Sequence, residues 1–84
     1  MARLRDTWLY ELKDSNKIVY YGISHDPDKR AIQHSNAGKK FTHINIKSVA
    51  LTRESAEKRE RQEIQRYQRQ RRGRSPKYNK AKTY

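Results

Sequence analysis

The residue of this chain with the clearest chemical potential is Glu60, a carboxylate in the middle of the longest expected helix. Ala56, Glu60, Ile64 and Tyr67 are spaced four, four and three residues apart, so they share one helical face. No other stripe of the segment is apolar, and we therefore expect this face to pack inward and to carry Glu60 with it. A buried ionised carboxylate needs a cation. Glu60 therefore either pairs with an arginine or binds a metal ion, and both interpretations stay open at this point.

Two further polar residues, Arg30 and His34, lie four positions apart on an expected helix and so share a face. Arginine suits bidentate contact with a phosphate, and histidine suits proton transfer near neutral pH. A solvated arginine and a surface histidine would have the same spacing, so the pair carries little weight alone.

Tyr10 and Tyr20 lie in two aromatic-rich runs that we expect to form neighbouring strands. A free phenol, with a pKa of about 10, is a poor base at neutral pH. Beside a cation or a metal it can orient or deprotonate a water molecule. The alternative is that both tyrosines pack in the core, as most strand tyrosines do.

The elements that would position these residues can be read along the chain. Residues 8–12 and 18–23 are apolar and β-branched or aromatic, and the polar cluster 13–17 between them predicts a β-hairpin. Residues 44–51 alternate in polarity and predict a third strand.

Two helices are expected. Asp26-Pro27 is a good N-cap followed by a proline at the first helical position, which predicts a helix over 27–36 ended by Gly38. Thr52 or Glu54 could cap a second, unusually polar helix over 55–71, and the Gly, Ser and Pro residues that follow would end it.

Size and composition limit the function classes. We expect one domain, residues 1–84, with a small core, because hydrophobic residues make up 32% of the chain. The absence of cysteine excludes disulfides and thiolate metal sites. No apolar run approaches the ~18 residues of a membrane span, and the first ten residues lack the apolar stretch of a secretory signal. We therefore expect a cytoplasmic protein without a membrane partner.

Charge is the strongest bulk signal. Twenty-one Lys and Arg face nine Asp and Glu, giving a net charge of +12 and a pI near 10.3. Such an excess favours nucleic acid as a partner, because each phosphate contact releases counterions. We expect the basic segment from 58 to 74, with the basic tail after it, to bind the nucleic-acid backbone through Lys58, Arg59, Arg66, Arg69, Arg71, Arg72 and Arg74.

The order of these residues resembles the GIY-YIG nuclease superfamily, which includes phage homing endonucleases and the N-terminal nuclease of the bacterial excision-repair complex. Trp8-Leu9-Tyr10 is similar to the first motif, and Tyr20-Tyr21-Gly22 to the second. The likeness spans residues 8–79 and includes Arg30 and His34 on the first helix, His43 after it, Glu60 on the second helix and Asn79 in the closing segment. Tyr20 or Tyr21 could fill the second tyrosine position, and Tyr20 is preferred because Gly22 then occupies the glycine position.

The resemblance implies a small α+β fold, a three-stranded antiparallel sheet flanked by helices, and a metal-dependent endonuclease that hydrolyses DNA. Glu60 would hold one divalent cation, Mg²⁺ or alternatively Mn²⁺, and Arg30 would neutralise charge on the phosphate. Tyr10 would position or deprotonate the water with help from His34, and His43 would assist. Tyr20 and Asn79 would support the site. The family also implies a bacterial or phage-infected cell.

Several alternatives stay open. A non-catalytic nucleic-acid-binding module, for example one that binds RNA, would have the same size, charge and tyrosine content. An accessory subunit that keeps the nuclease fold is a third interpretation. Nicking of one strand, or cleavage of both strands by a homodimer, are equally compatible with the sequence.

Overall fold

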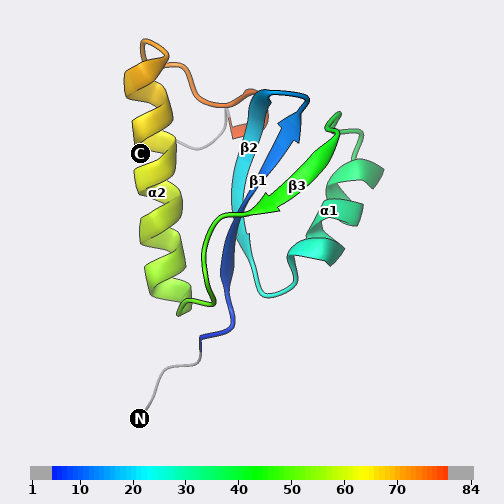
Figure 1. The fold of residues 1–84 in the computed structure, drawn as a ribbon, viewed down its shortest axis with the longest axis vertical. Helices are drawn as coiled ribbons and strands as arrows, with labels where there is room; N and C mark the ends of the chain where they lie inside the picture. The colour runs from blue at the N-terminus through cyan, green and yellow to red at the C-terminus, as the bar shows by residue number, and fades with distance from the viewer. Residues whose placement is uncertain (1–4, 80–84) are drawn as a thin grey trace.

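The computed structural model describes residues 5–79, and residues 80–84 of the expected basic tail (77–84) lie outside these residues. The described residues form a three-stranded sheet, two α-helices and a short 3₁₀ helix (Figure 1). In chain order these elements are β1 (Trp8–Asp14), β2 (Lys17–Ser24), α1 (Pro27–Asn36), β3 (His43–Ile46), α2 (Arg53–Gln70) and η1 (Lys77–Asn79). The expected α+β fold class is confirmed.

The hairpin of β1 and β2 turns through two residues, Ser15 and Asn16. Ser15 has φ 57°, the positive value that the first central residue of a type I′ or II′ hairpin turn requires. Leu12 pairs with Tyr20, whereas Lys13 pairs with Ile18, so Val19 is an extra residue that forms a β-bulge.

The sheet has the order β2-β1-β3 and is antiparallel throughout the described strands. β3 is shorter than the predicted strand over 44–51 because a side chain interrupts the ladder. The Leu9 amide donates to the hydroxyl of Ser48 at 3.0 Å instead of to a backbone carbonyl. Pairing resumes only at an isolated bridge between Thr7 and Leu51, and the intervening Val49 is 77% exposed.

The helices cover opposite faces of the sheet, which stands between them in Figure 1. On the α1 side, Tyr10, Leu12, Val19 and Tyr20 form one buried cluster. On the α2 side, Tyr21, Ile64 and Tyr67 form another. The neighbouring residues Tyr20 and Tyr21 on β2 thus belong to different buried clusters, because successive side chains along a strand point to opposite faces of the sheet.

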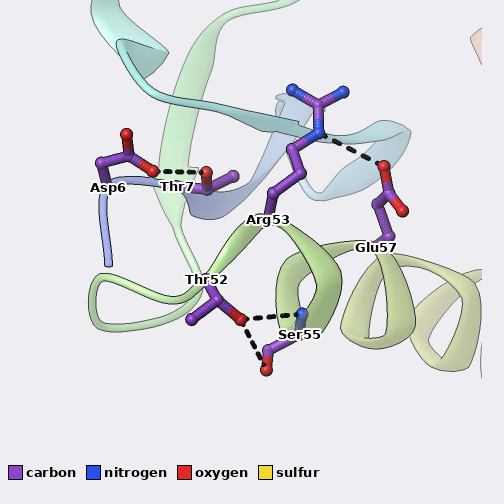
Figure 2. A network of polar contacts seen from close by, with 6 residues as sticks. All are labelled: Asp6, Thr7, Thr52, Arg53, Ser55 and Glu57. Carbon is purple, nitrogen blue, oxygen red and sulfur yellow. Dashed lines mark hydrogen bonds and ion pairs between the residues drawn. The ribbon is translucent and has the colours of Figure 1, made fainter. Parts of the chain in front are cut away.

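Both helices begin close to the predicted residues. The Asp26 carboxylate accepts from the Lys29 amide, and Pro27 occupies the first turn of α1. At α2, the Thr52 hydroxyl accepts from the Ser55 amide at 3.2 Å (Figure 2). The cap therefore places the start of α2 at Arg53, two residues before the expected start. None of the helices within residues 5–79 has the length and apolar character needed to cross a membrane.

Candidate active site

Tyr10 and His34 join the sheet to α1 through a buried polar contact. The Tyr10 hydroxyl lies 2.8 Å from Nε2 of His34, and the two residues are 0% and 4% exposed. Tyr10 is central on β1 and faces α1, while His34 lies on the last turn of α1. The two residues therefore form a hydrogen bond shielded from water, and burial makes such a bond sensitive to the protonation of either partner.

Tyr20 completes an aromatic group with this pair. Its ring centroid lies 4.7 Å from that of His34 and 6.1 Å from that of Tyr10. Tyr21, the neighbouring tyrosine, instead packs edge-on against Tyr67 on the α2 side. Tyr20, rather than Tyr21, therefore packs next to Tyr10.

Gly22 makes room for this arrangement. Gly22 pairs with Tyr10 across the two strands. A Cβ atom at position 22 would lie 2.6 Å from both the Tyr10 hydroxyl oxygen and Cε2 of Tyr20. Real Cβ atoms do not approach so closely, so any side chain there would push the two tyrosine rings aside. The glycine of the second motif thus has a steric function here.

A cleft of about 380 Å³ opens where the two helices meet β2, and we call it the edge cleft. It is lined by Tyr20 and Ile23 from β2, by Arg30 from α1, and by Arg53, Glu57, Glu60 and Arg61 from α2. Residues that are far apart in sequence thus meet at one place. Tyr10 has no exposed surface and does not line the cleft, so it can influence a reaction there only through its neighbours.

Glu60 lies on the inward face of α2 and is 5% exposed. The buried residues of this helix are Ala56, Glu60, Ile64 and Tyr67, which confirms the predicted face. Glu60 thus faces inward and also lines the edge cleft. In this position its carboxylate can contact a bound solute while it is shielded from bulk water.

The electrostatics around Tyr10 link it to the cleft residues. Burial raises the pKa of the Tyr10 phenol well above its ordinary value, and the neighbouring Tyr20 raises it further. The Arg30 guanidinium opposes this rise in pKa, whereas the Glu60 carboxylate adds a little to it. Tyr10 is therefore a neutral phenol at physiological pH, and it is close enough to both Arg30 and Glu60 to sense their charges.

Asn79 supports the site from the outer edge of the sheet. Its side-chain oxygen accepts from the Tyr21 amide at 2.8 Å, and its side-chain amide donates to the Tyr21 carbonyl at 3.0 Å. Because β2 is an edge strand of the described sheet, these two groups have no partner there from a described strand. Asn79 thus replaces a fourth strand at one residue, next to Tyr20 and Gly22.

His43 lies apart from Tyr10, Tyr20 and His34. It is exposed at the start of β3, opposite Lys13, and its Nδ1 lies 3.0 Å from the hydroxyl of the adjacent Thr42. The cross-strand register places it three residues from the Tyr10–Ile46 pair, which sets it apart from the edge cleft.

Sequence reasoning missed three cleft residues, Arg53, Glu57 and Arg61. Their spacing of four residues, adjacent to Glu60, puts them on one side of α2 and could have shown that they accompany it. The Arg53 side chain is held by Glu57 through an ion pair of 3.3 Å, drawn in Figure 2. This pair is exposed, so it exchanges readily for other partners.

Glu11 is a second buried carboxylate that the sequence analysis did not single out. It is 4% exposed, on the middle of β1. Lys47 approaches it at 3.4 Å, and the Asn45 side-chain amide donates to it at 3.4 Å. Both partners belong to the β3 side of the sheet, away from the edge cleft, and Glu11 therefore has a structural explanation.

The oxygen ligands of the edge cleft suit a hard divalent cation. Within residues 5–79, no three His, Cys, Asp or Glu side chains form a group that could hold a metal ion by themselves. Magnesium commonly uses only one or two protein carboxylates and completes its octahedron with water and phosphate oxygens. Glu60 and Glu57 both line the cleft, so the residues present fit a cation shared between protein and substrate.

Comparison of the chain with protein-family models, with curated proteins and with solved structures finds no match. The resemblance to the GIY-YIG nucleases therefore depends on the motif residues themselves. Tyr20, Arg30 and Glu60 line the edge cleft, Tyr10 and His34 pack next to Tyr20, and Asn79 bonds the backbone of β2, whereas His43 lies apart.

Proposed function

We propose that this protein is an endonuclease that hydrolyses DNA phosphodiester bonds with one divalent cation in the edge cleft. The observation that carries the proposal is the position of Glu60. A carboxylate that is 5% exposed, yet lines a cleft together with Arg30, suits a cation bound next to a phosphate. A surface acid would hold such a cation more weakly, since bulk water would screen the interaction.

Arg30 and Glu60 approach the cleft from different helices, so a phosphate between them meets opposite charges on two sides. The Arg30 guanidinium would donate to the non-bridging phosphate oxygens and stabilise the charge that grows there. Glu60 would hold the cation. When bound, the cation polarises the phosphate and stabilises the leaving oxygen.

The aromatic group supplies the side chains that would orient the attacking water and accept its proton. Tyr20 lines the cleft and is the tyrosine placed to orient a water molecule for in-line attack. His34 packs against the Tyr20 ring, and its Nε2 lies 2.8 Å from the Tyr10 hydroxyl. Tyr10 is then a positioning residue that fixes the orientation of the His34 ring, and a histidine suits proton transfer near neutral pH.

The surface of α2 supports a nucleic-acid substrate. The seven Lys and Arg residues predicted to bind backbone are all exposed: Lys58, Arg59, Arg66, Arg69, Arg71, Arg72 and Arg74. Such contacts position a duplex without selecting its sequence. We therefore propose cleavage of low intrinsic sequence specificity, by nicking or by a homodimer that cuts both strands.

A non-catalytic binder, of RNA or DNA, is the second candidate. It is favoured by the abundance of exposed cations beyond those of the edge cleft. The two candidates differ at Glu60, since a pure binder gains nothing from a carboxylate inside a phosphate-binding cleft.

The decisive experiment incubates the protein with supercoiled plasmid in Mg²⁺, in Mn²⁺ and in EDTA. We expect nicking or linearisation in either metal and none in EDTA. RNA offered in parallel tests the choice of substrate. Glu60→Gln keeps the size of the side chain but removes the charge, so cleavage should be lost while DNA affinity stays or increases.

Glu63→Gln is the matched control, because it removes the same charge from the same helix at a residue outside the edge cleft. It should cleave like the native protein. A Glu60→Gln protein that melts at a lower temperature and still cleaves would show that Glu60 is a salt-bridge residue, and it would contradict the metal assignment. A native protein that binds DNA without cutting it in either metal would favour the non-catalytic binder.

A further inference from the structure

A second hollow on the described residues lies away from the edge cleft. It has a volume of about 570 Å³ and lies where the C-terminal end of α2 meets the hairpin turn and η1. We call it the basic cavity, and its lining residues are Lys17, Tyr67, Arg71, Arg74, Ser75 and Lys77. Arg71 and Arg74 are among the residues that the sequence analysis named for backbone binding, and Lys77 begins the basic tail that was expected to add to them.

The charge of the basic cavity is of one sign. Four of its lining residues are Lys or Arg, and within residues 5–79 no carboxylate lines it. Lys17 is the first residue of β2, Arg71 is the C-cap of α2, Arg74 lies in the loop after α2, and Lys77 lies in η1. These four side chains therefore come from separate elements of the fold. Cations converging on one hollow attract an anion with several negative charges.

The walls of the basic cavity are held by specific contacts. The Gln68 side-chain amide donates to the Ser75 hydroxyl at 2.8 Å, and the Gly73 amide donates to the Gln68 carbonyl at 2.7 Å. The Arg71 guanidinium lies over the Tyr67 ring, 5.2 Å from its centroid. These contacts hold the loop after α2 against the helix and orient the Arg71 side chain. An anion that binds here therefore contacts side chains that are already partly ordered.

The chemistry of the lining favours phosphodiester over other anions. Two arginines offer planar forks that match phosphate oxygens, and two lysines add point charges. The hollow is larger than one phosphate requires, so a stretch of backbone with successive phosphates fits better than a single ion. An extended polyanion can also reach the exposed cations on the rest of α2.

The distance between the two sites along α2 can be compared with the helical repeat of DNA. Arg71 follows Glu60 by eleven residues, which corresponds to about 17 Å along a helix. This is roughly half of the ~34–36 Å helical repeat of B-DNA. A duplex that follows α2 would therefore present one phosphate to the edge cleft and, about five base pairs away along its axis, a phosphate of the other strand to the basic cavity.

We propose that the basic cavity is a second binding site, for the sugar–phosphate backbone of nucleic acid about five base pairs from the cleaved bond. The inference rests on the proposed function for its substrate, but binding at this site requires no cleavage. Its function is to set the direction of the duplex along α2.

The test measures binding of the native protein and two double variants to a fluorescent DNA duplex of about 20 base pairs, in EDTA and over a range of salt. Arg71→Gln with Arg74→Gln removes two cations of the basic cavity. The control, Arg59→Gln with Arg69→Gln, removes two exposed cations from the same helix that line neither the basic cavity nor the edge cleft. Circular dichroism and thermal melting are used to check that both variants are folded.

We expect the cavity variant to bind about tenfold more weakly than the control variant, and its salt slope to fall by about 0.9 for each phosphate that the variant no longer neutralises. Lys17→Gln with Lys77→Gln should reproduce the weaker binding from other elements. Phosphate-ethylation interference should mark a phosphate about five base pairs from the site of nicking. Inorganic phosphate should compete far less well than a short oligonucleotide.

Equal reductions of affinity in the cavity and control variants would overturn this inference while leaving the proposed function intact. Competition by inorganic phosphate as strong as that by the oligonucleotide would show a site for free phosphate and would also overturn it. If the native protein bound no DNA duplex at any salt concentration, the proposed DNA substrate would fail as well.

Discussion

The side chain of Asn79 makes two hydrogen bonds to the backbone of Tyr21, accepting at 2.8 Å and donating at 3.0 Å, and so seals the outer edge of β2. Asn79 is 1% exposed. Asn79→Ala would leave two buried backbone groups without partners, at a cost of about 1–3 kcal/mol for each. We expect a marked loss of stability in urea denaturation. Asn45→Ala, at an exposed residue with one long hydrogen bond, is the control and should change little.

Gly22→Ala tests whether the glycine holds the tyrosine pair in place. The added methyl would lie 2.6 Å from the hydroxyl oxygen of Tyr10, which is fully buried. We expect a folded protein whose nicking rate falls about as far as that of Tyr10→Phe, which removes the hydroxyl alone. Gly38→Ala is the control, since it has positive φ but nothing near its Cβ, so it should lose some stability and keep its activity. Native cleavage by both Gly22→Ala and Tyr10→Phe would reduce Tyr10 to a core residue.

Arg30→Gln should separate catalysis from binding. Loss of one preorganised charge at the reacting group commonly costs about 10²–10³ in rate. We expect a fall of that order in single-turnover nicking at saturating protein, with little change in DNA affinity, because many other cations remain. Lys29→Gln removes an exposed charge one residue away and should cleave normally. Equal effects of the two changes would mean that Arg30 contributes only to general attraction.

Stability should decline at alkaline pH. Burial raises the pKa of Tyr21 to about 12, with nearby Glu63 and Glu11 adding to the effect, and burial raises the pKa of Tyr10 further still. The folded state therefore holds both phenols protonated, whereas the unfolded chain releases their protons above its pKa of about 10. The stabilisation is complete below a pH of about 10 and is lost as the pH rises through the folded pKa values. Urea denaturation between a pH of about 7 and about 11 measures this decline, and Tyr21→Phe should make it shallower. A free energy of unfolding that stayed level over this range would contradict the raised pKa values.

The sequence by itself determined the local structure well, because the signals are local. The Asp26-Pro27 pair specifies the start of α1 through a cap and a fixed φ, and α1 begins and ends where predicted. The apolar face of α2 required Glu60 to turn inward, and it does. The motif order also pointed to Tyr10, Tyr20, Arg30, His34 and Glu60 as one group. The length of β3 was overestimated because alternation in polarity does not reveal that a serine hydroxyl replaces a ladder hydrogen bond.

Only the tertiary structure decided which residues meet. The bulge at Val19 sets which tyrosine of the Tyr20–Tyr21 pair faces α1, since a shift of one residue exchanges the two faces of a strand. The same packing buries Tyr10 behind Tyr20 and leaves His43 outside the group. The basic cavity depends on Lys17 and Arg71, which belong to different elements and meet only when the hairpin turn comes to lie near the end of α2. Contacts of this kind arise from long-range packing, and the spacing of residues along the chain carries no record of them.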